Sequence, residues 1–120
     1  AVIESARYVY KNRKIICVFQ PHRYSRVHFL KKEFSYSFKL SDEVILCPVY
    51  SAGEKIKYNF KQENFSQLIS KNSNTQVINV ENQNELKNYL RKNLYADEMI
   101  ICMGAGTISN WIREIGNEIK

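Results

Sequence analysis

The sequence predicts a three-layer α/β domain in which helices cover both faces of a mainly parallel four-stranded sheet. Two observations lead to this prediction. Four short apolar runs alternate with amphipathic stretches, which is the pattern of repeated strand–helix–strand units. The strand cores are also continuously apolar, as at residues 15–19 and 44–47. Such runs suit strands that are buried on both faces, so helices are needed on both sides of the sheet.

The four apolar runs predict strands of ordinary length. They are expected at residues 14–20, 43–50, 75–80 and 98–103. Because crossovers between parallel strands are right-handed, one reversal of direction gives a doubly wound, Rossmann-like sheet. The expected strand order is fourth, first, second, third. Ligands of such sheets bind at the carboxyl ends of the strands, so functional residues are expected there.

Five amphipathic stretches are expected to form the helices. Their apolar side chains recur at helical spacing around residues 2–10, 27–38, 65–69, 86–90 and 108–119. The second stretch places four apolar residues on one buried face: Val27, Leu30, Phe34 and Phe38. Before the fourth stretch, Asn82 and Glu85 have the spacing of a capping box. The element order is therefore one helix followed by four strand–helix units.

Length and composition indicate a single soluble domain over residues 1–120. The chain has 44% hydrophobic residues, enough for a core. The sequence has no signal-peptide pattern, and no apolar run approaches the roughly 18 residues of a membrane span. We therefore expect a cytoplasmic protein with no membrane partner. The formal charge of +6 favours anionic partners without selecting among them.

The cysteines and histidines give no sign of a metal or redox site. Cys17, Cys47 and Cys102 each lie in an apolar run and show no Cys-x-x-Cys spacing. They are expected to be buried, reduced residues. His22 and His28 are the only histidines, so no structural zinc site is expected.

The most informative segment is residues 19–26, Phe-Gln-Pro-His-Arg-Tyr-Ser-Arg, where the first strand ends and the next helix begins. It gathers His22, Arg23 and Arg26 at the positive end of a helix, which is unfavourable unless an anion lies between them. Arginine suits a carboxylate or phosphate held by paired hydrogen bonds. Alternatively, either arginine could pair with a core carboxylate or cap a neighbouring helix. Tyr24 is expected to pack rather than react.

Two further segments follow strands at the same edge of the sheet. Tyr50, Ser51, Ala52, Gly53 and Glu54 combine small residues with a carboxylate that could receive an ammonium group, although a simple turn explains them equally. The Gly-Ala-Gly-Thr run at residues 104–107 is a weak phosphate signal, because the third glycine and the later acidic residue of the dinucleotide fingerprint are missing. A tight strand-to-helix turn is the simpler interpretation.

The motifs resemble one family of ligases. Residues 19–26 are similar to the FQPHRYSR signature of the UDP-N-acetylmuramate:L-alanine ligases (MurC), a branch of the Mur ligase family. Residues 41–44, 49–54 and 103–106 resemble further segments of the same family in the expected order. Ligases that add other amino acids differ at the first motif. Thr107 departs from the family, where aspartate is common, so it is assigned no role. The family's Asp-Tyr-x-His-His-Pro stretch is expected just before Ala1.

The resemblance implies the C-terminal, amino-acid-binding domain of a three-domain cell-wall enzyme. The N-terminal domain, which binds the UDP-sugar, and the central domain, which binds ATP and magnesium, would lie outside this chain. The partners of the whole enzyme would be L-alanine, UDP-N-acetylmuramic acid and ATP. ATP would phosphorylate the muramate carboxylate, and the amine of L-alanine would attack the acyl phosphate. The isolated domain would bind no cofactor of its own and would be inactive.

The resemblance also implies roles for individual residues. Arg23 and Arg26 would hold the carboxylate of L-alanine, and His22 would lie on the substrate and phosphate side. The pocket wall would be formed by Tyr50, Ser51, Ala52, Gly53 and Glu54. No catalytic residue is assigned.

Two other functions remain open from the residues. The first is a non-catalytic phosphate- or nucleic-acid-binding module that uses the basic rim. It requires stacking aromatic residues near His22, and Tyr36, Tyr58 and Tyr95 show no suitable spacing. The second is a stand-alone enzyme acting on phosphates. The sequence contains no Gly-x-x-x-x-Gly-Lys-Ser/Thr loop and no recognisable nucleophile arrangement for it.

Overall fold

The computed structural model describes residues 2–94, 97–104 and 106–119. Its sheet contains β1 (Ile15–Gln20), β2 (Glu43–Leu46), β3 (Gln76–Asn79) and β4 (Met99–Gly104), in the order β3-β2-β1-β4. The three neighbouring pairs are all parallel. The predicted strand order and direction are therefore confirmed.

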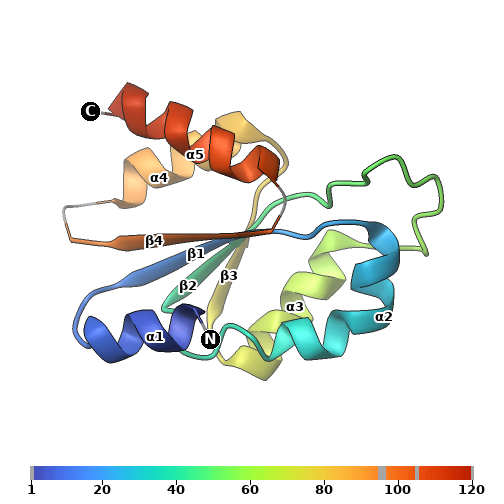
Figure 1. Ribbon diagram of the computed structural model, residues 1–120, viewed down its shortest axis with the longest axis horizontal. Helices are drawn as coiled ribbons and strands as arrows, with labels where there is room; N and C mark the ends of the chain where they lie inside the picture. The colour runs from blue at the N-terminus through green and yellow to red at the C-terminus, as the bar shows by residue number, and fades with distance from the viewer. Residues whose placement is uncertain (1, 95–96, 105, 120) are drawn as a thin grey trace.

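The helices form the outer layers of the domain (Figure 1). One face of the sheet is covered by α1 (Val2–Val9), α2 (Tyr24–Ser35) and α3 (Gln62–Ser73). The other face is covered by α4 (Gln83–Asn93) and α5 (Gly106–Ile119). The predicted αβα layering is confirmed. None of the helices, as far as they are described, is long and apolar enough to cross a membrane.

Alternation along the strands divides the core into two clusters, because successive side chains point to opposite faces. Towards α2 and α3, Phe19 packs against Phe34, Phe38 and Phe65, with ring centroids 5.2 to 6.4 Å apart. Towards α4 and α5, the cluster joins three strand residues to four helix residues: Ile16, Val18, Ile45, Leu86, Leu90, Ile108 and Ile115.

Cys17 lies in β1 and Cys102 in β4, whereas Cys47 directly follows β2. Cys17 and Cys47 are buried, and burial raises the pKa of both thiols to about 12. Cys102 is only partly buried. Cys17 and Cys47 are thus the inert core residues that their apolar surroundings predict.

Three local predictions need correction. β2 ends at Leu46 rather than at residue 50, because Pro48 has no N–H with which to continue the ladder. Leu30 is 39% exposed and does not belong to the buried face of α2. Phe38 is buried, but it enters the core from the turn after α2, which ends at Ser35.

The predicted capping box of α4 is confirmed in one of its two hydrogen bonds. Asn82 accepts the Glu85 N–H through Oδ1 at 2.9 Å. The Glu85 carboxylate accepts the N–H of Glu81, at 2.6 Å, instead of the N–H of Asn82. The first turn of α4 is stabilised by both contacts.

Gly104 provides a test of how tightly β4 packs against β1. Its φ is +115°, and a Cβ atom built there would lie 1.8 Å from the carbonyl oxygen of Gln20. Gly53 also has a positive φ, +86°, but no atom lies within 4 Å of its would-be Cβ. We expect Gly53→Ala to cost about 1 to 2 kcal/mol of unfolding free energy from backbone strain alone. Gly104→Ala should cost clearly more, or prevent folding. Urea unfolding of both variants checks this, and equal losses would contradict the register at Gly104.

Candidate functional site

The predicted motifs meet at the carboxyl edge of the sheet. The Arg23 N–H donates to the Tyr50 carbonyl at 2.7 Å, and the Tyr50 N–H donates to the Pro21 carbonyl at 2.9 Å. Gly104 lies opposite Gln20 in the β1–β4 register. The loops after β1 and β2 are therefore joined backbone to backbone, beside the end of β4. Ala105 and the side chain of Thr107 lie outside the described residues.

Arg23 occupies an unusual backbone conformation at the start of α2. It is the N-cap residue, its φ is +73°, and its side chain makes no capping hydrogen bond. Positive φ is uncommon for a residue with a Cβ atom and is found at functional sites more often than elsewhere. The hydrogen bond to Tyr50 helps to hold this conformation, and the Arg23 side chain is exposed.

Glu54 supplies the cap that Arg23 does not. Its carboxylate accepts the backbone N–H of Ser25 at 3.1 Å and also accepts the Ser25 hydroxyl. The turn that delivers it contains two left-handed residues, Ala52 at φ 52° and Gly53 at φ 86°. A carboxylate at a helix N-terminus is stabilised by the unpaired N–H groups and the helix dipole. The chain itself therefore places a carboxylate at this helix end.

These contacts change the acidity of Glu54. The hydrogen bond from the Ser25 hydroxyl is the largest cause that lowers the pKa of its carboxyl below the ordinary value of 4.5. The backbone N–H groups of Ser25 and Tyr24 and the positive charge of Arg23 act in the same direction, against partial desolvation. Glu54 therefore stays ionised under physiological conditions.

The side chains of His22 and Arg26 have other neighbours. The half-buried His22 ring stacks on Tyr50, with centroids 5.5 Å apart and an interplanar angle of 11°. The Arg26 guanidinium lies 5.9 Å from the centre of the Phe34 ring, on the side of α2. The structure brings Arg23, Glu54 and Tyr50 together, whereas Arg26 points along the helix. The joint anion site of His22, Arg23 and Arg26 stays a prediction.

Two residues at this edge were not predicted from the sequence. Ser25 is the partner of Glu54, and only its place in the first turn of the helix hints at that role. Gln20 is 5% exposed, and its amide donates to the Pro48 carbonyl at 3.2 Å. Its Oε1 atom is buried without a hydrogen-bond partner among the described residues. A glutamine that ends an otherwise apolar strand was the available signal.

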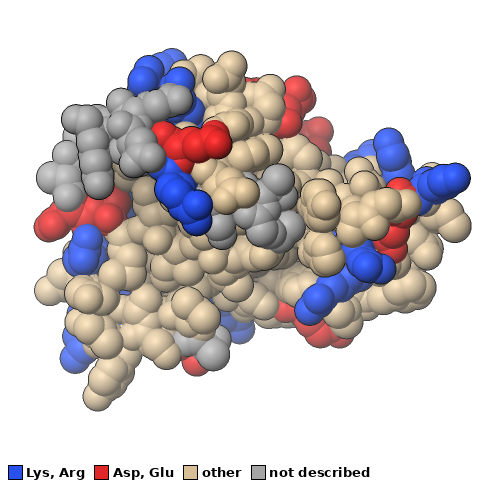
Figure 2. Space-filling model, turned by 45° about the horizontal axis from the view of Figure 1, so that its top comes forward, with Lys and Arg blue, Asp and Glu red and all other residues tan. Residues whose placement is uncertain are grey.

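The charges of the domain do not form one continuous basic surface on the face shown in Figure 2, where basic and acidic side chains are interspersed. Within the described ranges, no three His, Cys, Asp or Glu side chains gather closely enough to hold a metal ion. The chemistry that this edge can supply is therefore binding and orientation by arginine, histidine and backbone N–H groups.

Comparisons with known proteins identify relatives of the chain. It is 50% identical over 114 residues to the UDP-N-acetylmuramate–L-alanine ligase of Pelagibacter ubique, and the match covers 95% of the chain and 25% of that protein. It is 43% identical over 107 residues to the ligase of the same name from Fusobacterium nucleatum, with 89% and 22% covered. The chain thus spans about a quarter of the length of these curated relatives. No family model matches it.

A solved structure supports the fold. A crystallised domain from Haemophilus ducreyi, described as part of a UDP-N-acetylmuramate:L-alanyl-γ-D-glutamyl-diaminopimelate ligase, superposes with a TM-score of 0.67. The match covers 99% of this chain and 79% of that one, at 14% sequence identity. At this identity the likeness concerns the fold alone.

The contact between Glu54 and Ser25 predicts a pH-dependent contribution to stability. Because the pKa of Glu54 is lowered by folding, its contribution is present above the ordinary value of 4.5 and is lost as the pH falls through the lower value of the folded state. Glu54→Gln should therefore lower the melting temperature near neutral pH. The difference in melting temperature between this variant and the wild type should become smaller as the solution is acidified. Glu33→Gln, at an exposed position on the same helix α2, is the matched control. If the difference in melting temperature stays the same at acidic pH, the ionised Glu54 carboxylate does not stabilise the fold through Ser25.

Proposed function

The chain belongs to the Mur ligase family, and from this premise we propose that it is the C-terminal domain of an ATP-dependent ligase that joins L-alanine to UDP-N-acetylmuramic acid. In this proposal the full-length enzyme works in the cytoplasm in peptidoglycan synthesis. The domain positions L-alanine for attack on an acyl phosphate. The observation that carries the proposal is the position of the first motif: Arg23 and Arg26 begin α2 at the ligand-binding edge of the sheet, in a chain 50% identical to part of an alanine-adding ligase.

The arginines would bind the amino acid through its carboxylate. Arg23 is exposed, and its backbone is fixed by Tyr50, so its guanidinium can face a substrate without a change in the main chain. Arg26 is one turn further along α2 and would have to leave Phe34 to join it. A guanidinium can bind a carboxylate through two parallel hydrogen bonds, which fixes orientation as well as position. The amine of L-alanine would then face the reacting carbonyl, supplied from outside this chain.

The loop of Tyr50, Ser51, Ala52, Gly53 and Glu54 would form one wall of the amino-acid pocket. Since both oxygens of the Glu54 carboxylate already accept from Ser25, this residue would act by holding the loop against α2. His22 would lie on the phosphate side, supported by its stacking on Tyr50. A pocket of limited size discriminates one methyl group by about 1 to 3 kcal/mol, which suits selection of alanine.

ATP and magnesium would be held by the central domain of the full-length enzyme. ATP supplies the phosphoryl group that activates the muramate carboxylate, and magnesium supplies positive charge to the phosphates. Two observations support this division of roles: the described residues contain no cluster of metal ligands for magnesium, and the sequence has no Gly-x-x-x-x-Gly-Lys-Ser/Thr loop for ATP. The chain would therefore act on the amino acid and, through His22, beside the phosphate.

The first test of the proposal concerns the isolated chain. With UDP-N-acetylmuramic acid, L-alanine, ATP and magnesium added, it should release no phosphate above background and form no amide product. Phosphate release and product formation are measured together over a range of protein concentrations. Turnover that scales with protein and survives repurification would overturn the assignment as a positioning domain.

The second test uses the full-length enzyme that contains this chain. Arg23→Ala or Arg26→Ala should remove a charged hydrogen bond and weaken alanine binding about ten- to a hundredfold. Lysine at either position should restore only part of the loss, because it keeps the charge but not the paired geometry. KM values for ATP and for UDP-N-acetylmuramic acid should change much less.

The matched control for these variants is Arg91→Ala. Arg91 is exposed near the end of α4, on the opposite face of the sheet from α2. The Arg91→Ala variant should leave the KM values for L-alanine, ATP and UDP-N-acetylmuramic acid unchanged. If Arg23→Ala and Arg26→Ala leave the KM for L-alanine as unchanged as Arg91→Ala does, in folded enzyme, the two arginines are structural. The proposal that they bind the carboxylate of L-alanine is then wrong.

A further inference from the structure

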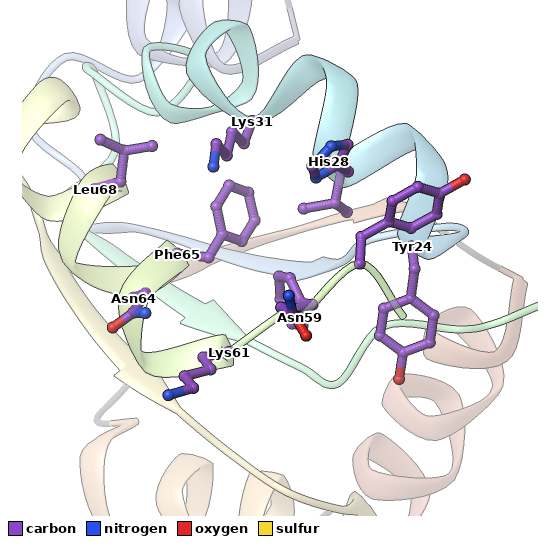
Figure 3. A pocket seen from close by; sticks show the side chains of 11 residues that line it. Tyr24, His28, Lys31, Asn59, Lys61, Asn64, Phe65 and Leu68 are labelled. Carbon is purple, nitrogen blue, oxygen red and sulfur yellow. The ribbon is translucent and has the colours of Figure 1, made fainter. Parts of the chain in front are cut away.

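A hollow between α2 and α3 lies outside the site described above. It has a volume of about 330 Å³ and is closed on its third side by residues 58–61, which lead into α3 (Figure 3). This volume lies within the range of roughly 300 to 1,000 Å³ that is usual for small-molecule sites. Neither Arg23 nor Glu54 lines the hollow. The hollow is therefore distinct from the amino-acid site proposed around Arg23.

The walls of the hollow are largely aromatic. Phe60 contacts both Tyr24 and Phe65, with ring centroids 5.8 and 6.0 Å apart. At the α2 side, Tyr58 stacks on His28 at 4.7 Å. Edges and faces of aromatic rings in this arrangement favour a flat ring as the ligand, through offset-stacked or edge-to-face contacts.

The same hollow carries positive charge without a partner. Lys31 from α2 and Lys61 at the N-cap of α3 both line it, and Figure 3 shows them on opposite sides of Phe65. Among the described residues, neither ammonium group lies in an ion pair or hydrogen bond. The N-terminus of α3 adds its own positive pole beside Lys61. Glu63, in the first turn of α3, is exposed and does not line the hollow.

Two amide side chains complete the lining. Asn59 and Asn64 border the hollow, and within the described parts of the chain neither amide group has a hydrogen-bond partner. Each amide can donate two hydrogen bonds and accept others. Together with the lysines, they provide donors for a negatively charged group next to an apolar wall.

From these features we propose that the hollow between α2 and α3 is a binding site for a small molecule that carries a flat ring and an anionic group, carboxylate or phosphate. The ring packs against Tyr24, Phe60 and Tyr58. The anionic group binds at the polar rim of the hollow, where Lys31 and Lys61 provide positive charge and the amides of Asn59 and Asn64 provide further donors. Both parts are needed, because the aromatic wall gives no charge and the lysines alone are exposed and well hydrated.

The test is a titration of the isotope-labelled 120-residue chain, followed by NMR chemical shifts. Phenyl phosphate and benzoate present a ring with an anion, inorganic phosphate presents the anion alone, and benzyl alcohol presents the ring alone. One of the two ring-anion probes should bind at least about tenfold more tightly than either part. Which of them binds better distinguishes a phosphate ligand from a carboxylate ligand. The shifts should concentrate at His28, Asn59 and Asn64.

Substitutions locate the anionic group. Lys31→Gln and Lys61→Gln should each weaken binding of the better probe about three- to tenfold, since each removes one charged contact. Lys32→Gln, next to Lys31 but outside the hollow, is the matched control and should leave binding unchanged. The proposal is overturned if neither ring-anion probe binds better than phosphate or benzyl alcohol, if the shifts map elsewhere, or if Lys31→Gln and Lys32→Gln behave alike. None of these outcomes bears on the alanine dependence of the full-length enzyme.

Discussion

The complete burial of β1 is the constraint on which the rest of the domain depends. This strand pairs on both edges, and its six residues are between 0% and 5% exposed. An apolar strand in this position must be covered on both faces, which requires a layer of helices on each side. Because the strands are parallel, each connection from a strand to its helix leaves at the same edge. The loops after β1 and β2 therefore lie at the same edge as the end of β4. Their closeness follows from the parallel sheet, and the contacts between the loops come second.

Glu54 then fixes how two of these loops are joined. A cationic residue at the N-cap of α2 cannot accept the free N–H groups of the first turn, so Arg23 leaves them without a side-chain acceptor. The carboxylate of Glu54 accepts one of them from the neighbouring loop. Capping and recognition are thereby divided between two residues. Glu54 accepts a free N–H group of the first turn of α2, and the Arg23 side chain stays exposed at the edge of the sheet.

The fold could be predicted further than the site. Continuous apolar runs locate strands such as β1 and β4 within one residue, because burial on both faces leaves a strong pattern in the sequence. Leu30 was misplaced because its spacing fits a buried face equally well, and only the position of α3 decides which residues of α2 are covered. The contact between Ser25 and Glu54 spans 29 positions and depends on two left-handed residues, which no local pattern specifies. The hollow beside Lys31 and Lys61 likewise arises only when α2 and α3 are packed.

Tyr24 connects the two regions of α2 that carry functional proposals. Its ring lines the hollow and contacts Phe60, while its backbone lies between Arg23 and Ser25. Its N–H also contributes to lowering the pKa of Glu54. A ligand that displaced the Tyr24 ring would therefore act on the first turn of α2, where the capping carboxylate and the exposed arginine are placed. The Arg23 backbone has a positive φ, a region that is narrow for residues with a Cβ atom. It can therefore change little while its N–H stays hydrogen-bonded to the Tyr50 carbonyl. The hydrogen bonds of Glu54 and Tyr50 would resist a small shift of Tyr24, so they limit how far a ligand in the hollow could change the first turn of α2.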